Sequence, residues 1–127
     1  MSIQDENRKL IEKIKNGETV ILNRRRHHEA ITYAENKNVL VPCDRTSKSK
    51  FGNPHYMESE SQRMKVIVAF WNDIKYGRSK LTPADFASLH GKSLLCWCFP
   101  KRCHCEVLRF VANKLHDGLT LDEIKKL

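Results

Sequence analysis

The segment from Cys96 to Cys105 constrains this chain more than any other. Its sequence, Cys-Trp-Cys-Phe-Pro-Lys-Arg-Cys-His-Cys, holds four of the five cysteines of the chain. The apolar run 93–98 has no polar alternation, which is typical of a strand buried on both faces. From residue 103 to 115 apolar residues recur at helical spacing, which predicts a helix. The chain must therefore fold around a strand–turn–helix unit whose turn, bending at Pro100, is crowded with thiols.

The N-terminus and the cysteine count bear on the compartment. Residues 1–10 are polar and charged, without the apolar stretch of a secretory signal. Five cysteines are an odd number for a disulfide framework. No apolar run approaches the ~20 residues that a membrane-spanning helix needs. We therefore expect reduced thiols, no membrane partner and a cytoplasmic protein, in the host cytoplasm if the protein is viral.

Four reduced thiols within ten residues can bind a metal ion. Zinc in proteins takes four tetrahedral ligands from cysteine and histidine. The spacing here differs from the usual pair of Cys-x-x-Cys knuckles, so one ion can be shared only if the turn folds back. The candidate ligands for zinc are Cys96, Cys98, Cys103 and His104.

Two other interpretations of the segment need no metal. In one, Cys103 is a nucleophile at a helix N-terminus beside Arg102, a setting that lowers a thiol pKa, and His104 is its catalytic partner. In the other, Cys96 and Cys98 are core residues, since free cysteine is among the most buried residue types. Cys103 and His104 then only shape the edge of a pocket. The sequence leaves all three interpretations open.

Helical and strand patterns alternate along the rest of the chain. Apolar spacing, caps and β-branched runs predict helices at 3–15, 61–76, 82–89 and 103–115, a last helical turn at 120–127, and strands at 19–23, 30–33, 39–41 and 93–98. The stripe expected to be buried in the 61–76 helix is Met64, Ile67, Val68, Trp71 and Ile74. This alternation predicts an α/β fold, a small three-layer sandwich with a short, mostly parallel sheet. We expect one domain over residues 1–127.

The charge balance is basic. Lysine and arginine number 23 against 15 aspartate and glutamate, which gives a formal net charge of +8. A surplus of this kind favours polyanionic partners such as nucleotides, phosphorylated small molecules or nucleic acid. The tightest basic cluster runs from Arg24 to His28. We therefore expect a partner that carries phosphate.

A polar loop from Arg45 to Pro54 is a second candidate for chemistry. Arg45 is cationic, Ser49 can donate a hydrogen bond, and Gly52 permits close approach of a ligand to the backbone. Together they suit a phosphate or a ribose, although the order of residues matches neither the Walker nor the dinucleotide-binding motif. Arg63, near the start of the next helix, can point back at the same anion.

Five segments taken in order resemble a known family. They are residues 20–25, 39–45 and 49–54, Arg63 with Phe70, and residues 91–104. The last, Gly-Lys-Ser-Leu-Leu-Cys-Trp-Cys-Phe-Pro-Lys-Arg-Cys-His, is the most specific. This order resembles the small bacterial and phage proteins grouped as domain-of-unknown-function family 4326, over residues 20–115. Two positions depart from the family pattern, since His55 replaces an aromatic Phe and Cys105 replaces a Gly.

The resemblance implies a set of site residues but no activity. Its pattern is similar to that of small Rossmann-like nucleotide-handling proteins. Binding of a nucleotide at these residues requires the 45–54 loop and the 98–104 segment to lie within the ~12 Å that an ordinary pocket spans, and the sequence alone does not establish this. The implied ligand-binding residues are Asn23, Arg24, Arg45, Ser49, Gly52, Asn53, Arg63 and Cys98, and the implied catalytic residues are Cys103 and His104.

The function that we expect is binding of a nucleotide or nucleoside phosphate. Arg45, Arg63 and the helix N-terminus at Cys103 would hold the phosphate, and Asn53 and His104 would orient the rest. If the protein is an enzyme, hydrolysis of a phosphoester or glycosidic bond is favoured over redox chemistry, although no carboxylate matches a general-base motif. The alternatives are a zinc-stabilised module that binds nucleic acid and a phage-encoded inhibitor that captures an acidic protein.

Overall fold

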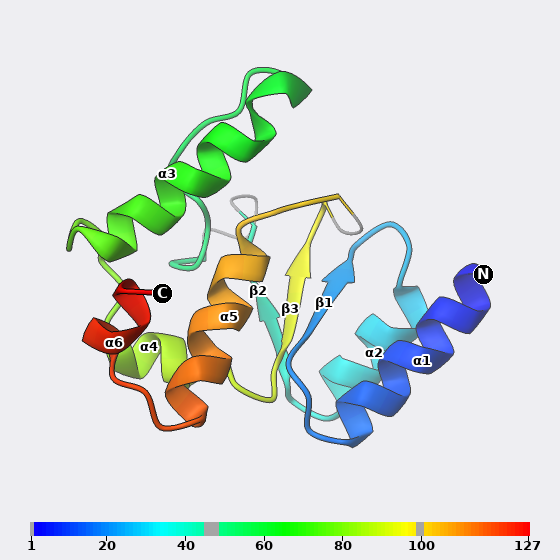
Figure 1. The fold of residues 1–127 in the computed structure, drawn as a ribbon. Coiled ribbons are helices and arrows are strands. Elements are labelled where there is room, and N and C mark those ends of the chain that lie inside the picture. Colours follow the sequence, from blue (N-terminus) through cyan, green and yellow to red (C-terminus); the bar gives the residue numbers. More distant parts are fainter. Residues whose placement is uncertain (1, 45–48, 99–100) are drawn as a thin grey trace.

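A small parallel sheet forms the centre of the molecule. The structure, a computed structural model, describes residues 2–44, 49–98 and 101–127. Within these ranges the strands are β1 (Val20–Asn23), β2 (Leu40–Pro42) and β3 (Ser93–Cys96). Their order is β1-β3-β2, so the last strand in the sequence pairs in parallel with both of the others (Figure 1). The expected α/β class with a short parallel sheet is confirmed.

Helices cover both faces of the sheet, which makes three layers. They are α1 (Ile3–Lys15), α2 (His28–Asn36), α3 (Arg63–Lys75), α4 (Pro83–Ala87), α5 (Cys105–His116) and α6 (Leu121–Lys125), with a 3-10 turn, η2 (Glu60–Gln62), before α3. α1 and α2 lie against one face, and α5, with α4 and α6 beside it, lies against the other (Figure 1). Among the described residues, no helix combines the length and the apolar character that crossing a bilayer requires.

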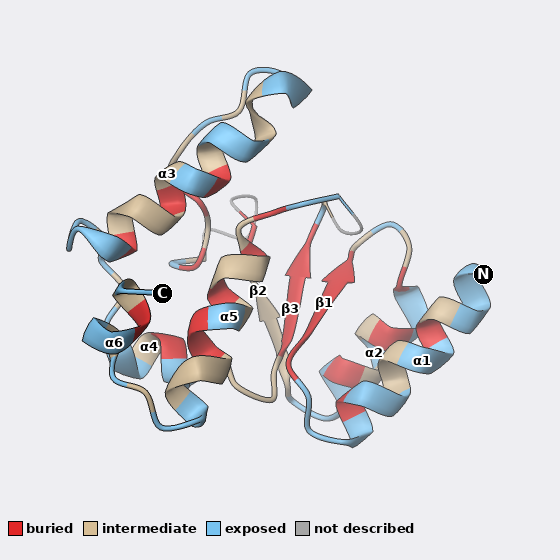
Figure 2. Cartoon of the chain, viewed as in Figure 1, coloured by how far each residue is buried: buried red, intermediate tan, exposed pale blue. Residues whose placement is uncertain are grey.

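Side chains of the strands alternate between two apolar clusters. Leu22 and Leu95 pack with residues of α1 and α2. Ile21, Leu94 and Cys96 pack with residues of α5 on the opposite face. All residues of β1 and β3 are buried (Figure 2), as expected for parallel strands covered on both sides. Cys96 therefore ends the central strand on the side where α5 begins.

The strand predicted at 30–33 is wrong, because these residues belong to α2. Ala30 and Ala34 are about one helical turn apart and fully buried. Their small side chains let the helix lie close to the sheet, and this burial outweighs the strand preference of the β-branched residues between them. After α2 the chain turns toward β2, and Asn38 adopts a left-handed conformation there, with φ 58°.

The helix predicted from residue 103 starts two residues later than expected. α5 begins at Cys105, with His104 at its N-cap. Cys103 therefore belongs to the segment before the helix and is not part of its first turn. The bend predicted at Pro100 lies outside the described residues.

The buried face of α3 differs from the predicted stripe. Ile67, Phe70 and Ile74 are buried, whereas Met64 and Val68 are 46% and 49% exposed. α3 lies beyond α5 and away from the sheet (Figure 1). The helix therefore buries one narrow strip of residues rather than the broad face that covers a sheet.

Candidate functional site

Polar side chains collect where the three strands end. Arg24 follows β1, Asp44 follows β2 and Trp97 follows β3. The Asp44 carboxylate accepts a hydrogen bond from Arg24 Nη2 at 3.1 Å and another from the Trp97 indole Nε1 at 2.9 Å. The side chain of Asp44 is only 7% exposed. One buried carboxylate therefore joins the carboxyl ends of all three strands.

Asn23, a predicted ligand-binding residue, makes hydrogen bonds within the protein. Its Nδ2 donates to the Trp97 carbonyl at 3.1 Å, and its Oδ1 accepts from the Arg25 N–H at 2.7 Å. Its own backbone N–H donates to Nδ1 of the buried His27 at 2.9 Å. Asn23 thus holds the ends of β1 and β3 together and positions the side chains that follow them.

Protonation of His27 should destabilise the fold, because its Nδ1 accepts the hydrogen bond from Asn23. Burial lowers the pKa of His27 from its usual 6.5, and attraction to Glu6 opposes this only in part. The unfolded chain binds the proton at the usual pKa, so stability is full above about pH 6.5 and is lost as the pH falls below it. We expect the Tm to fall between about pH 7 and 5.5, and to fall less in His27→Gln. Thermal unfolding followed by circular dichroism measures both; equal falls in the two proteins would exclude His27 as the cause.

Two arginine side chains lie over the ring of Trp97. The guanidinium carbons of Arg24 and Arg25 lie 5.5 and 5.2 Å from the ring centroid, within the range of cation–π attraction. Trp97 is 43% exposed. The basic cluster that starts at Arg24 therefore begins on a partly exposed aromatic surface at the carboxyl edge of the sheet.

A cavity of about 340 Å³ opens beside these groups. Its walls come from the segment between β3 and α5, from the loop after β2 and from the start of α3. The predicted site residues that line it are Asn53, Arg63, Cys96, Cys98, Cys103 and His104. The other lining residues are Asp44, His55, Tyr56, Met57, Val66, Ile67, Trp97 and Arg102.

His104 ties the loop after β2 to the start of α5. Its Nε2 lies 3.0 Å from the carbonyl oxygen of Cys43 and 2.8 Å from that of Phe51. Since both partners are acceptors, Nε2 carries the hydrogen and donates to them. The ring also packs edge-on against Phe70, with centroids 5.1 Å apart. The two predicted constellations therefore converge in space.

Other predicted residues of the loop shape it from within. Asn53 Nδ2 donates to the Val66 carbonyl at 3.0 Å, and its Oδ1 accepts from the His55 N–H at 2.9 Å. Ser49 Oγ accepts a backbone N–H of the loop at 3.1 Å. Asn53 thereby fastens the loop to α3. Arg45, the predicted cation of this loop, lies outside the described residues.

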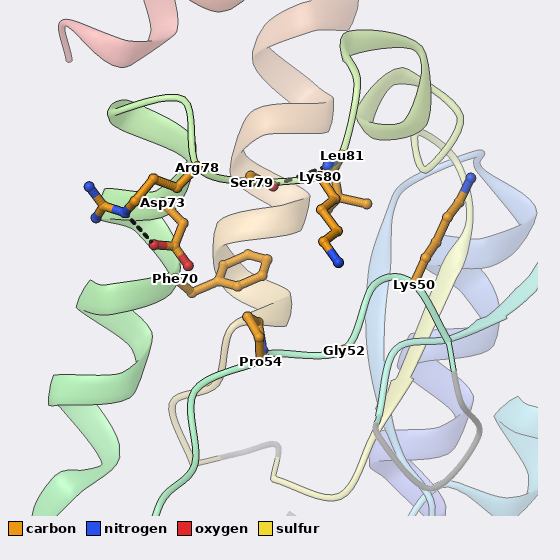
Figure 3. Close-up of a pocket in the computed structure, with 9 residues that line it drawn as sticks. All are labelled: Lys50, Gly52, Pro54, Phe70, Asp73, Arg78, Ser79, Lys80 and Leu81. Atoms are coloured by element: carbon orange, nitrogen blue, oxygen red, sulfur yellow. Dashed lines mark hydrogen bonds and ion pairs between the residues drawn. The ribbon is translucent and has the colours of Figure 1, made fainter.

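Gly52 lines a separate cavity of about 290 Å³ (Figure 3). Two of its cations are paired locally, Lys50 with Asp85 at 2.6 Å and Arg78 with Asp73 at 3.1 Å. We take the first cavity as the candidate site, because ligands of open α/β sheets bind at the carboxyl ends of the strands.

Arg63 holds an exposed carboxylate beside the first cavity. Its Nε and Nη2 donate to the two oxygens of Glu60 at 2.9 and 2.7 Å, and its Nη1 donates to the Arg102 carbonyl at 3.0 Å. Lys101 Nζ lies 3.5 Å from the same carboxylate. The hydrogen bonds from Arg63 lower the pKa of Glu60 to about 2. Because this guanidinium fork fits phosphate as well as carboxylate, Glu60 marks a position for an anion.

The surroundings of Cys98 favour a thiolate more than those of Cys103, the nucleophile in one of the three interpretations of the segment. Hydrogen bonds from Cys103 and from Arg63 lower the pKa of Cys98 to about 6, against the opposing effect of burial. At Cys103 the contact with Cys105 lowers the pKa, but contacts with Cys96 and Cys98 and burial outweigh it, so the pKa is raised. These surroundings therefore favour the protonated thiol at Cys103 and the thiolate at Cys98, and both residues line the cavity.

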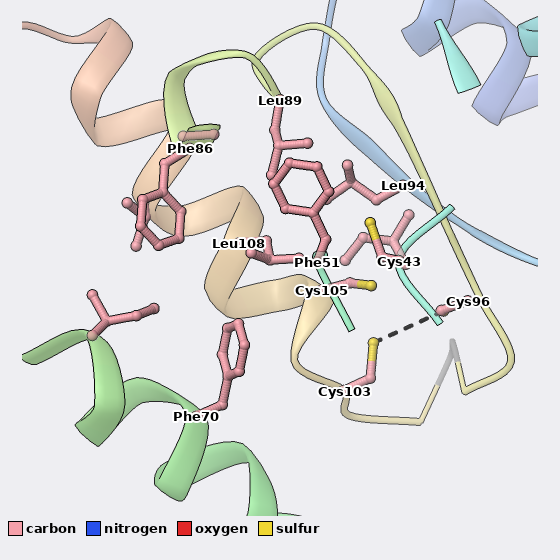
Figure 4. Packing of buried hydrophobic residues seen from close by; sticks show 14 of the residues in the cluster. Cys43, Phe51, Phe70, Phe86, Leu89, Leu94, Cys96, Cys103, Cys105 and Leu108 are labelled. Carbon is pink, nitrogen blue, oxygen red and sulfur yellow. Dashed lines mark hydrogen bonds between the residues drawn. The ribbon is translucent and has the colours of Figure 1, made fainter. Parts of the chain in front are cut away.

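Cys96, Cys103 and Cys105 form a buried thiol cluster. Their sulfur atoms all lie within 4.8 Å of one another, and none of the three residues is more than 3% exposed. The Cys103 thiol donates to Cys96 Sγ at 3.9 Å (Figure 4). The cysteines are free thiols rather than disulfides. Three thiols in this arrangement can hold a metal ion, and Cys105 stands here in place of the predicted ligand His104.

Two groups of the site are not among the residues predicted from the sequence. One is Asp44, although its position two residues after β2 is a usable signal. The other is the pair of His55 and Asp73, in which Nε2 and Oδ2 lie 2.6 Å apart. Nothing local in the sequence connects residues that far apart in the chain. The pair adds a histidine oriented by a carboxylate to the wall of the cavity.

Comparison with known proteins places the site within a family. The family model described as "Domain of unknown function (DUF4326)" matches residues 22–114. The match includes the residues that line the cavity and the thiol cluster. No curated protein and no solved structure matches the chain.

Proposed function

The chain belongs to the DUF4326 family, and since that description names no activity, we propose a function from the site itself. The protein binds a small phosphate-bearing ligand of the nucleoside-phosphate class in the cavity at the carboxyl ends of its strands. The observation that carries the proposal is that the exposed carboxylate of Glu60 accepts two hydrogen bonds from Arg63 and forms an ion pair with Lys101.

The phosphate takes the position that Glu60 holds in the free protein. The Glu60 side chain is 62% exposed, so an anion can displace it without opening the core. The Arg63 side chain is only 15% exposed and is fixed by the Arg102 carbonyl. The guanidinium group of Arg63 therefore keeps its orientation when Glu60 leaves. A guanidinium that is already held in place binds an anion with less loss of side-chain entropy.

The rest of the ligand lies against the cavity wall. A volume of about 340 Å³ is within the range of small-molecule pockets. Trp97, Val66 and Ile67 supply an apolar surface for a base. Asp44 supplies carboxylate oxygens, which accept several hydrogen bonds each and suit a ribose hydroxyl. The net charge of +8 attracts the phosphate over a longer range.

The cavity also offers a proton acceptor. His55 lines it, and Asp73 orients the imidazole from outside. A histidine held by a carboxylate is a frequent general base. If the ligand is cleaved, we propose hydrolysis of a phosphoester or glycosidic bond, in which His55 takes a proton from the attacking water.

Arg63→Ala should weaken ligand binding by about 10–100-fold, since hydrogen bonds to charged groups contribute about 1.5–3 kcal/mol. Glu60→Gln should strengthen binding by up to about fivefold, because a competing surface ion pair is removed. AMP, CMP, ribose 5-phosphate and inorganic phosphate serve as probes, in thermal shift assays and calorimetry.

Arg8→Ala is the matched control, because Arg8 is an exposed cation on α1. Its affinity should equal that of the wild type. The proposal fails if no probe raises the Tm of the wild type, or if Arg63→Ala binds as tightly as the control.

A second candidate is a zinc-stabilised module that binds nucleic acid. The buried thiol cluster favours it, and so do the two arginines that lie over Trp97. This function requires one bound zinc and binding to DNA or RNA that weakens steeply with salt. Titration of an oligonucleotide at two salt concentrations separates it from nucleotide binding, which has the small-ligand specificity that this module lacks.

A further inference from the structure

The four cysteines of the segment 96–105 are spaced Cys-x-Cys-x4-Cys-x-Cys. We infer that Cys96, Cys98, Cys103 and Cys105 bind one zinc ion as a closed tetrathiolate centre. The fifth cysteine, Cys43, is outside the centre. This inference does not depend on ligand binding in the cavity, and its test reads the metal alone.

Three of the sulfur atoms already have nearly the geometry of a zinc site. Zinc–sulfur bonds are about 2.3 Å long, so the edges of a tetrahedral tetrathiolate are about 3.8 Å. The sulfurs of Cys96 and Cys103 are 3.9 Å apart, and Cys105 lies within 4.8 Å of both. Small side-chain rotations therefore bring the three sulfurs to the corners of a coordination tetrahedron.

The fourth thiolate is chosen by what surrounds the two remaining cysteines. Cys98 lines the same cavity wall as Cys96, Cys103 and Arg63, and its thiol interacts with Cys103 and with the Arg63 guanidinium. A guanidinium next to a coordinated sulfur stabilises the negative charge that zinc leaves on it. A zinc ion with four thiolates has a net charge of −2, and Arg63 offsets part of it.

Cys43 is also close to the cluster but is poorly placed as a ligand. It touches Cys105, and its thiol donates to the Val41 carbonyl oxygen at 3.4 Å. As a thiolate it would lose this hydrogen bond and face an oxygen that carries partial negative charge. Metal binding through Cys43 is therefore less favourable than binding through Cys98.

The burial of its ligands indicates that the zinc centre is structural rather than catalytic. Cys96, Cys103 and Cys105 are almost fully buried, so four thiolates close the coordination sphere and leave no position for water or substrate. The centre links the end of β3 to the first turn of α5. It thereby fixes the segment that supplies Trp97 and Arg102 to the cavity.

Native mass spectrometry and cobalt substitution of the full chain test the inference. The wild type should bind one zinc, and bound Co²⁺ should give the charge-transfer absorption of four thiolates. Cys98→Ala should bind zinc at least about tenfold more weakly. With Co²⁺ this variant should give the weaker charge-transfer absorption of three thiolates. Cys98→Ser, which keeps the size of the side chain, should behave in the same way.

Cys43→Ala is the control and should match the wild type in affinity and spectrum. Circular dichroism shows whether each variant is folded, and Cys98 is partly exposed, which favours folding of its variants. The inference is overturned if the wild type binds no zinc. It is also overturned if Cys43→Ala loses as much affinity as Cys98→Ala, or if the two Cys98 variants lose none.

Discussion

Leu94→Ala is expected to lower the free energy of unfolding by about 2–5 kcal/mol. Leu94 is fully buried in the central strand and packs in the apolar cluster that includes α5. Truncation removes apolar contacts and leaves a cavity between strands and a helix that cannot fully collapse. Ordinary domains have about 5–15 kcal/mol of stability in all, so this single change should remove a large part of it.

Urea unfolding followed by circular dichroism measures this loss. Val68→Ala is the control, because Val68 is 49% exposed on α3, and its change should stay within about 0.5 kcal/mol. A loss below about 1 kcal/mol in Leu94→Ala would show that β3 is not enclosed on both faces.

His104→Ala should cost about 2–5 kcal/mol of stability and should abolish ligand binding as well. The change removes the donor to the Cys43 and Phe51 carbonyls, and each unsatisfied buried acceptor costs about 1–3 kcal/mol. It also removes the ring that packs against Phe70. Since these contacts join the loop after β2 to the start of α5, the cavity should lose its shape.

His104→Gln distinguishes this positioning role from a catalytic one. The glutamine amide has two N–H donors, so it can satisfy the same carbonyls. We expect it to recover part of the stability and of the affinity for the probe, measured by urea unfolding and calorimetry. If His104→Ala unfolds at the same urea concentration as the wild type, the two hydrogen bonds of His104 do not stabilise the fold.

Much of the architecture could be predicted from local patterns. The strand at 93–96 and the capped helices are visible because burial and capping follow from neighbouring residues. α2 could not be recognised in this way, since its helix depends on two small alanines that pack on a sheet formed by distant residues. The exposed face of α3 has the same cause: only the tertiary neighbours decide which apolar residues are covered.

Part of the cavity lining could be predicted from the sequence, but the contacts of these residues could not. Asn53, Cys98 and His104 line one cavity. The side chains of Asn53 and His104, however, donate hydrogen bonds to backbone carbonyl oxygens of other segments. The direction of a hydrogen bond between two cysteines cannot be derived from their spacing. For this reason the contacts that raise the pKa of Cys103 and lower that of Cys98 had no signal in the sequence, and neither had the pairing of His55 with Asp73.

The strand order has a consequence for the biosynthesis of the protein. β1 and β2 each pair with β3, which is synthesised after both of them. Until then the apolar residues of β1 have no neighbouring strand, and closing such long loops slows folding. The sheet can form only after β3 has been synthesised, and the segment that completes it also supplies cysteines and part of the wall of the cavity. A nascent chain of this protein therefore acquires its core and its candidate site in the same step.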